Sequence, residues 1–387
     1  MVNKEKNNFL FLVYLAGLSV IGFLATDMYL PAFDKMRIDL DTTKNSIGAS
    51  LTLFLAGYAI AQLLWGPLAD KIGRPQSILM GLGIFTLASL AISFTGDVTL
   101  LMVLRLVQAI GVCAAAVSWQ ALVIEYYPAE KTNKVFATIM PLVALSPALA
   151  PLLGVFLLDH FSWRSIFIVL AIIALPLMAY TFTLKSGRPA YGDQTKKKGE
   201  SYIQMLQSKT YVGNVMIYAV CSGAFFAWLT GSPFFLKELG YTEGQIGFSF
   251  VPQTIAFMLG GYGYRALSDK IEGRRILPFL LVLYAVAVIG VLAVTMAMTP
   301  TLAWLLVPFC LMALANGACY PIVVAQAMKL FPNSLGKASA LQNALQLGTC
   351  FLASGIVSLF SSTALLTTAL VMVGTIPFVL IGFRLSK

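Results

Sequence analysis

Apolar runs of about 20 residues follow one another along the whole chain, and short segments with charged residues, proline, glycine or asparagine separate them. Each run is long enough for a helix to cross roughly 30 Å of hydrocarbon. Because lipid offers no hydrogen bonds to an unpaired backbone, spanning segments of this kind are expected to be helical. We predict an all-α membrane protein with twelve transmembrane helices, at residues 8–33, 44–68, 76–95, 99–121, 132–157, 163–184, 210–236, 244–266, 276–298, 301–327, 337–360 and 363–384.

The twelve predicted helices fall into two sets of six. Residues 185–209 are the one hydrophilic segment of any length and are interpreted as a linker, which predicts a six-helix bundle at 1–184 and a second at 210–387. The sequence LADKIGR at 68–74 is echoed by LSDKIEGR at 267–274, and both copies follow the second helix of their half. Such a repeat predicts two pseudo-symmetric bundles, a plan in which transporters place their site between the halves.

Composition and charge support a membrane location. Hydrophobic residues make up 59% of the chain and charged residues 11%, whereas an ordinary soluble domain is roughly 25% charged. The net charge of +10 could indicate a nucleic-acid partner, but twenty of the 26 lysines and arginines lie in segments on the side of both termini. Five lie on the opposite side, and Arg105 lies within a helix. This asymmetry predicts a multi-pass membrane protein with both termini in the cytoplasm, and no nucleic-acid partner.

Several other classes of protein are excluded by what the sequence offers. His160 is the only histidine, and the five cysteines lie in apolar runs without metal-ligand spacing. We therefore expect no metal, no cofactor and no enzymatic activity. A receptor would need an extramembrane domain, for which no loop is long enough, and a channel would need rings of pore-lining charge.

Two ionisable side chains inside predicted helices are candidates for proton coupling. Asp27 is the clearest acid within a span, and an apolar setting favours its neutral form, which suits binding and release of a proton. The alternative is a paired structural aspartate near the outer boundary. Arg105 is a rare charge inside a helix, and Gln108 lies one turn away on the same face. Arg105 could serve proton coupling, substrate contact or structure alone.

The loop after the second helix carries a motif. Within residues 66–75, Gly66 allows close helix approach, and Asp70 can pair with Arg74 and with the positive start of the next helix. These charges could instead only set the topology. The segment resembles the signature between helices 2 and 3 of the major facilitator superfamily. The resemblance implies a major facilitator fold, in which Gly66, Asp70, Gly73 and Arg74 lock one conformation.

Three further segments resemble one group within that superfamily. ATDMYLPA at 25–32 closely resembles the helix 1 signature of the Bcr/CflA drug:proton antiporters, and RLVQAIG at 105–111 is similar to the R-x-x-q-x-x-g pattern of such antiporters. In helix 5, Pro147, Pro151 and Gly154 belong to SPALAPLLG, which departs from the antiporter signature where that signature has glycines. The resemblance covers essentially the whole chain and is closest to the bacterial YdhC/PunC branch.

The resemblance implies proton-coupled secondary transport of small organic molecules by alternating access, as in multidrug efflux. The YdhC/PunC branch implies an alternative, purine nucleoside transport, including uptake. The proton gradient would be the energy source, and the resemblance implies a monomer within the lipid bilayer of the bacterial inner membrane.

Amides and aromatic rings in otherwise uncharged spans suggest a neutral or weakly charged aromatic or heterocyclic substrate. Any single one of these residues is as readily explained by helix packing or by an interfacial position. The candidates for substrate binding are Tyr29, Trp119, Phe226, Trp228, Gln253, Phe257, Asn316, Tyr320, Gln342 and Asn343.

Overall fold

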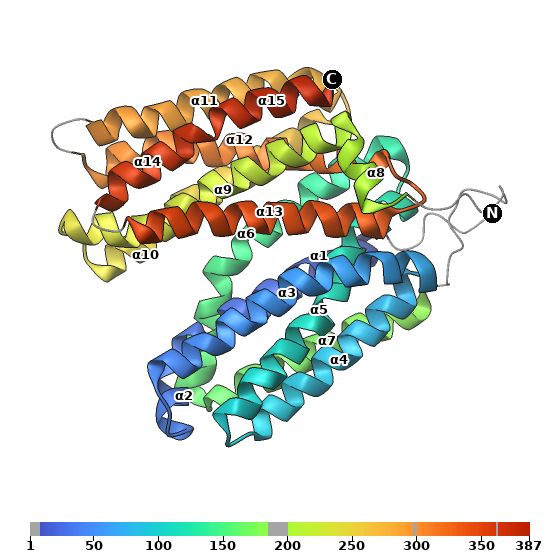
Figure 1. The fold of residues 1–387 in the computed structure, drawn as a ribbon, viewed down its shortest axis with the longest axis vertical. Coiled ribbons are helices and arrows are strands. Elements are labelled where there is room, and N and C mark those ends of the chain that lie inside the picture. The colour runs from blue at the N-terminus through green and yellow to red at the C-terminus, as the bar shows by residue number, and fades with distance from the viewer. Residues whose placement is uncertain (1–7, 185–199, 297–299, 361–362) are drawn as a thin grey trace. The chain divides into compact units, whose positions relative to one another are not determined.

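The computed structural model describes residues 8–184, 200–296, 300–360 and 363–387, and every element within these ranges is a helix (Figure 1). The elements are α1 (Asn8–Asp27), η1 (Leu30–Ala32), α2 (Phe33–Asp39), α3 (Lys44–Ile72), α4 (Arg74–Phe94), α5 (Val98–Tyr126), α6 (Ala129–His160), α7 (Trp163–Thr183), α8 (Tyr202–Gln207), α9 (Lys209–Glu238), α10 (Glu243–Leu267), α11 (Gly273–Met296), α12 (Leu302–Lys329), α13 (Leu335–Leu359), α14 (Ala364–Gly374) and α15 (Ile376–Ser386).

Each of the twelve predicted transmembrane segments contains a long helix or two consecutive helices among its described residues. Ten segments of the described chain are long and apolar enough to cross a membrane, judged by length and composition, and one of them combines α14 and α15 as Ala364–Ser386. The other two predicted spans are occupied by α6, of 32 residues, and α10, of 25 residues. The prediction of an all-α membrane protein is therefore confirmed. Most of the predicted linker, 185–199, lies outside the described residues.

Two helix ends differ from the prediction for identifiable reasons. The first helix was expected to run to residue 33, but α1 ends at Asp27 and a short 3₁₀ turn with Pro31 follows. Proline lacks a backbone N–H and disfavours a continuous α-helix through this point. The second helix was expected to end at residue 68, but α3 continues to Ile72, and Gly73 ends it with a φ of 95°. Glycine adopts such a positive φ without steric cost.

The helices pack into two compact units. The first contains the described residues of Met1–Tyr126, Leu145–Gly199 and Asn333–Leu341, and the second contains those of Tyr127–Ala144, Glu200–Pro332 and Gln342–Lys387. Each unit thus includes one segment from the opposite half of the sequence. The boundaries of the two predicted six-helix bundles, at residues 184 and 210, rest on the sequence and remain a prediction.

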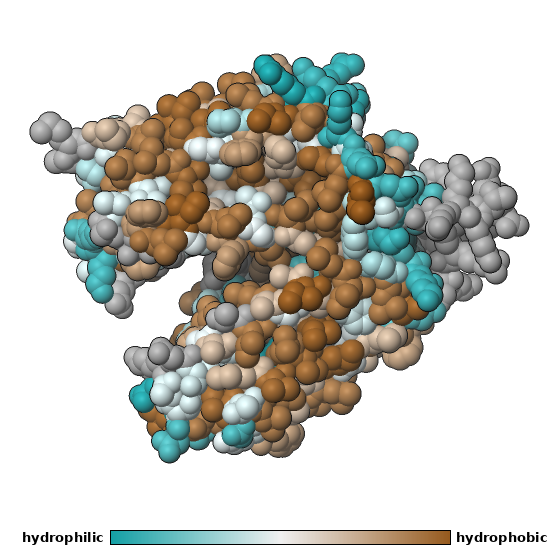
Figure 2. All heavy atoms as spheres, viewed as in Figure 1, coloured by the Kyte–Doolittle hydropathy of each residue, from teal (hydrophilic) through white to brown (hydrophobic). Residues whose placement is uncertain are grey.

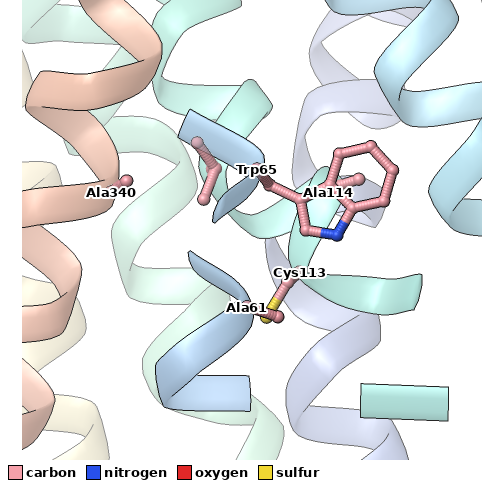
Figure 3. Packing of buried hydrophobic residues seen from close by; sticks show 6 residues of the cluster. Ala61, Trp65, Cys113, Ala114 and Ala340 are labelled. Carbon is pink, nitrogen blue, oxygen red and sulfur yellow. The ribbon is translucent and has the colours of Figure 1, made fainter. Parts of the chain in front are cut away.

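In the first unit, α5 packs against α1, α3 and α4, and α4 packs against α7. A buried cluster joins Trp65 of α3 and Cys113 of α5 with Ala340 at the start of α13 (Figure 3). The indole Nε1 of Trp65 donates a 2.7 Å hydrogen bond to the Ile110 carbonyl oxygen. A Cβ atom at Gly81 of α4 would overlap α5, so these two helices are in direct backbone contact.

In the second unit, α12 packs against α9, α10 and α11, and α9 also packs against α14 and α15. A Cβ atom at Gly260 would overlap the Leu314 carbonyl oxygen, and one at Gly317 would overlap the Phe257 carbonyl oxygen. Small residues at such crossings let helix backbones approach closely where lipid supplies no hydrophobic driving force.

The flanks of the helices are hydrophobic and exposed. Figure 2 shows hydrophobic side chains along the long helices of each unit and hydrophilic ones near helix ends. Leu87 on α4 is 70% exposed, and Phe279 on α11 is 76% exposed. Apolar surface of this extent is costly in water and is expected where lipid tails are the solvent.

Candidate functional site

Asp70 lies in the last turn of α3 and binds the start of another helix. Its Oδ1 accepts a 2.8 Å hydrogen bond from the backbone nitrogen of Gly336, and its Oδ2 accepts a 3.0 Å bond from that of Lys337. Both donors belong to the first turn of α13, where backbone N–H groups lack helical partners and carry a partial positive charge. The sequence predicts that Asp70 lies against the start of the next helix, α4, whose first residue is Arg74. The two bonds to α13 are a further contact that the sequence does not indicate.

Arg74 holds the same carboxylate from the other side. Gly73 ends α3, so Arg74 is the first residue of α4, and its guanidinium pairs with Asp70 at 2.6 Å, as the sequence predicted. The guanidinium also pairs with Glu125, near the end of α5, at 3.1 Å. Arg74 is 6% exposed. The buried pairs and the two backbone bonds join α3, α4, α5 and α13 at one point.

Gly336 makes room for this charged cluster. A Cβ atom at Gly336 would lie 2.5 Å from the Arg74 guanidinium and 2.5 Å from the carbonyl oxygen of Gly66. Gly66 is itself buried within α3. Sequence reasoning identified Gly66 but missed Gly336, because the contact joins residues far apart in the chain.

The repeated copy of the motif makes a weaker contact in the second unit. Asp269, after α10, forms an ion pair with Lys134 of α6. The two side chains are 58% and 38% exposed, compared with 12% for Asp70 and 7% for Arg74. Exposed ion pairs contribute little, on the order of 0–1 kcal/mol.

Arg105 on α5 is fully buried between aromatic rings. Its guanidinium carbon lies 4.1 Å from the ring centroid of Tyr29 and 4.2 Å from that of Phe54. The guanidinium donates to the side-chain oxygen of Gln108, whose Nε2 donates a 2.7 Å bond to Ser89 Oγ. No carboxylate of the described chain pairs with Arg105. The ring faces therefore supply much of the attraction for its charge.

Asp27 is the last residue of α1 and is partly buried. The carboxyl end of a helix carries a partial negative charge, which disfavours an ionised carboxylate there. No ion pair joins Asp27 to Arg105. The link between them is indirect, because Tyr29, two residues after Asp27, places its ring on the Arg105 guanidinium and is itself fully buried.

The helix 5 motif lies in α6, and it contacts the chain beside Asp27. Pro147, Pro151 and Gly154 are all within this helix. A Cβ atom at Gly154 would overlap the carbonyl oxygen of Met28. The motif therefore touches the break that follows α1, a contact that the sequence alone did not reveal.

Asp39, which follows the break after α1, has different surroundings from Asp27. Asp39 lies outside the spanning segments, at the end of α2, and accepts hydrogen bonds from Arg164 and from the indole Nε1 of Trp163, the latter at 3.0 Å. The Arg164 guanidinium, with help from Trp163, holds the pKa of Asp39 below its usual range. Asp39 therefore stays ionised near neutral pH and is a poor proton carrier.

Five of the substrate candidates gather in the second unit. Trp228 of α9 stacks on Phe309 with centroids 4.1 Å apart, and the rings of Phe257 and Tyr320 lie 5.6 Å apart. Asn316, one turn before Tyr320, donates from Nδ2 to the Cys221 carbonyl oxygen at 3.4 Å.

The fifth member, Gln253, lies one turn before Phe257 and is 1% exposed. Phe226 is half-buried on α9 and joins none of the ring contacts seen among the described residues. Of the remaining candidates, Tyr29 and Trp119 are buried in the first unit, and Gln342 and Asn343 lie on α13 in the second unit.

Comparisons with known proteins agree with this architecture. A bicyclomycin resistance protein homolog of Haemophilus influenzae is 26% identical over 89% of this chain and 83% of its own length. The multidrug resistance protein D of Escherichia coli is 26% identical over 91% of this chain and 89% of its own length. A crystal structure of a variant of the Escherichia coli fucose:proton symporter FucP superposes with a TM-score of 0.78, at 16% identity, over 99% of this chain and 100% of that one.

The resistance proteins agree with the resemblance to the Bcr/CflA group, and the symporter shows the fold alone. The family model described as Major Facilitator Superfamily matches residues 15–354. With twelve helical segments, a charged cluster after the second of them and relatives of this kind, the chain is a non-enzymatic, multi-pass membrane transporter that belongs to the Major Facilitator Superfamily.

Proposed function

We propose that this protein is a proton-coupled secondary transporter that expels small organic molecules, drugs among them, by alternating access. Its relatives are named for resistance to bicyclomycin and to multiple drugs, which supports efflux of such compounds. Those names give no support to the purine nucleoside alternative. We further propose that the chain acts as a monomer in the bacterial inner membrane, with both termini in the cytoplasm.

The placement of Asp27 is the observation that carries the proposal of proton coupling. It is an acid inside the first span, at the carboxyl end of α1, and has no ion-pair partner among the described residues. A carboxyl group in this position can lose its proton when water or a cation reaches it and regain it when the surroundings become apolar. In this proposal, proton binding and substrate binding favour opposite states of the transporter.

Arg105 has a supporting role in this scheme. Its charge is held between the Tyr29 and Phe54 rings, and Tyr29 follows Asp27 by two residues. A change of charge on Asp27 that moves the break after α1 would therefore also move a ring that contacts Arg105. This gives the protonation of Asp27 a physical route to α5.

The Asp70 cluster is proposed as the conformational lock. Two backbone bonds and the buried Arg74 pair attach the end of α3 to the start of α13. Hydrogen bonds to an ionised group contribute about 1.5–3 kcal/mol each. Breaking and remaking this attachment would make the transporter switch between two discrete states.

A transport assay in proteoliposomes tests the proposed function. Purified protein would be reconstituted, a pH gradient imposed, and the flux of labelled chloramphenicol, a fluoroquinolone, a cationic dye and a purine nucleoside compared. We expect drug flux that depends on the gradient and collapses with a protonophore. Nucleoside flux without drug flux would refute the proposal of drug efflux, and flux that ignores the gradient would refute proton coupling.

A further inference from the structure

Several buried side chains of the second unit carry polar atoms without a hydrogen-bond partner, and three of them, Trp228, Gln253 and Asn316, lie on the neighbouring helices α9, α10 and α12. Trp228 is 0% exposed, and Gln253 and Asn316 are each 1% exposed. The indole Nε1 of Trp228, both amide atoms of Gln253 and Oδ1 of Asn316 have no partner in the structure. Buried polar groups rarely lack a hydrogen-bond partner, and each exception calls for an explanation. A bound ligand that supplies the absent partners is one such explanation.

Trp228 and Gln253 lie at the same level of two facing helices. The rings of Phe225 on α9 and Phe257 on α10 are 6.5 Å apart. Because α9 ends at Glu238 and α10 begins at Glu243, the short connection makes them antiparallel. Trp228 follows Phe225 by three residues, and Gln253 precedes Phe257 by four. Both therefore lie about one turn from the ring contact, in the same direction.

The third side of this site comes from α12. Its Phe309 stacks on the Trp228 ring at 4.1 Å and 14° and lies 5.7 Å from the Phe225 ring. Two turns later, Asn316 faces α9 and bonds to Cys221. Aromatic rings thus lie between the unpaired indole and the unpaired amide oxygen, which are about two helical turns, or roughly 10 Å, apart.

We propose that Trp228, Gln253 and Asn316 form a ligand-recognition site, and that its ligand is a flat, uncharged aromatic molecule with a hydrogen-bond acceptor near one end and a donor near the other. The indole N–H requires an acceptor, the Asn316 oxygen requires a donor, and Gln253 can pair with both. The described side chains of the site carry no charge, so a fully charged ligand would be uncompensated there. Aromatic faces suit a flat ring.

The inference rests on the proposed function for its role in transport, because the ligand would be the transported molecule. The test therefore measures binding rather than transport. Full-length protein in lipid nanodiscs, at one pH and without a gradient, would be titrated with chloramphenicol, an uncharged nitrophenyl amide, by calorimetry. The thermal unfolding temperature of each ligand-free variant would be recorded alongside.

Two variants test the site by separating ligand binding from protein stability. Gln253→Leu and Trp228→Phe should each weaken chloramphenicol binding roughly three- to tenfold, the cost of a lost hydrogen bond. For Gln253→Leu, the ligand-free protein should unfold at the same or a higher temperature, because an unmet polar group has been removed from the interior. Trp228→Phe serves the binding measurement alone, because shortening a buried indole also leaves a cavity. If these side chains instead hold a structural water, Gln253→Leu should unfold at a lower temperature and both variants should bind chloramphenicol as the wild type does, which would overturn the inference.

Matched controls exist in the same unit. Trp304 on α12 is 67% exposed, so Trp304→Phe repeats the chemical change at a distant surface. Asn214 is a buried amide of α9 whose Nδ2 donates to the Thr210 carbonyl oxygen at 2.8 Å, so Asn214→Leu repeats the loss of a buried amide away from the rings. Both should leave the affinity for chloramphenicol unchanged. An equal loss of affinity in these controls would overturn the assignment of the site.

The ligand class has its own test. Tetraphenylphosphonium, an aromatic cation, should bind more weakly than chloramphenicol. Equal or tighter binding of the cation, lost in Gln253→Leu, would overturn the uncharged class. The two proposals fail in different ways. Transport that does not depend on protons would refute the proposed function but leave the binding results intact. Proton-driven transport together with unchanged chloramphenicol binding in Gln253→Leu would overturn this inference alone.

Discussion

The Asp70 carboxylate lies 2.8 Å from the backbone nitrogen of Gly336 at the start of α13, although 266 residues separate the two in the chain. A carboxylate in this position satisfies donors that the helix cannot satisfy itself and complements its partial positive charge. Because Lys337 and Arg74 bind the same carboxylate, its negative charge is matched from two sides.

Asp70→Asn should leave the protein folded but weaken this attachment. An amide has one acceptor oxygen in place of two, and its NH₂ group faces donors rather than acceptors. With about 1.5–3 kcal/mol at stake in each bond to the charged group, we expect the ratio of inward-open to outward-open protein to shift tenfold or more. Transport should fall while ligand binding survives. Distances between pairs of spin labels, measured by pulsed electron paramagnetic resonance, would report the ratio.

Asp269→Asn is the matched control for that change. It alters the equivalent residue of the repeat, where the ion pair to Lys134 is exposed and has little energetic weight. We expect a shift well below that of Asp70→Asn. Identical populations and transport in Asp70→Asn and the wild type would leave Asp70 with no role beyond setting topology.

Gly154→Ala should destabilise the protein near Asp27. The added Cβ atom would overlap the Met28 carbonyl oxygen, so α6 or the end of α1 must shift. Overpacking of this kind costs about 1–3 kcal/mol. The thermal unfolding temperature in detergent should fall, whereas Gly348→Ala, whose Cβ atom would meet nothing within 4 Å, should not lower it. Equal unfolding temperatures for the two variants would show that the contact between Gly154 and Met28 is not tight.

The topology follows from the distribution of lysine and arginine. Reporter fusions at Gly192, which lies outside the described residues, and at the C-terminus should score as cytoplasmic, and a fusion near Asp159 should score as periplasmic. Alkaline phosphatase and green fluorescent protein report the two sides with opposite signals. The reverse pattern at all three sites would invert the assignment.

The helices were predictable from the sequence because each apolar run exceeds the thickness of hydrocarbon. The residues at which the helices end were harder to predict. Asp70 and Lys71 mark the end of an apolar run but not of α3, because a helix continues until a residue such as Gly73 leaves helical geometry. The pairing of Asp70 with Arg74 was also predictable, since the two lie one turn apart.

The contacts that give the candidate sites their character depend on tertiary packing. The sequence indicated that Gln108 lies on the same helix face as Arg105, but not that Tyr29 and Phe54 would enclose the guanidinium. It likewise held no sign that Gly336 binds Asp70 or that Gly154 touches Met28. Each of these contacts joins helices whose arrangement is set by the whole fold, so short-range spacing carries no information about it.

The proton-coupling role of Asp27 leads to the sharpest prediction. Asparagine has nearly the shape of a protonated aspartate but cannot release a proton, so Asp27→Asn should mimic the permanently protonated state. Gradient-driven transport should be abolished, by about a hundredfold or more if no other group substitutes. The protein should stay folded and keep some ligand binding, because a neutral group at the carboxyl end of α1 is not opposed by the helix dipole.

Any substrate exchange that survives in Asp27→Asn should lose its dependence on pH between about pH 5 and 8, because the amide exchanges no proton. Exchange of labelled chloramphenicol across proteoliposomes, with equal pH on both sides, would measure this. Asp39→Asn is the control, since the Arg164 and Trp163 contacts keep Asp39 ionised through that range. It should leave the pH profile unchanged. Uphill transport by Asp27→Asn with a wild-type pH profile would show that Asp27 is not the coupling site and would direct attention to Arg105 and Glu125.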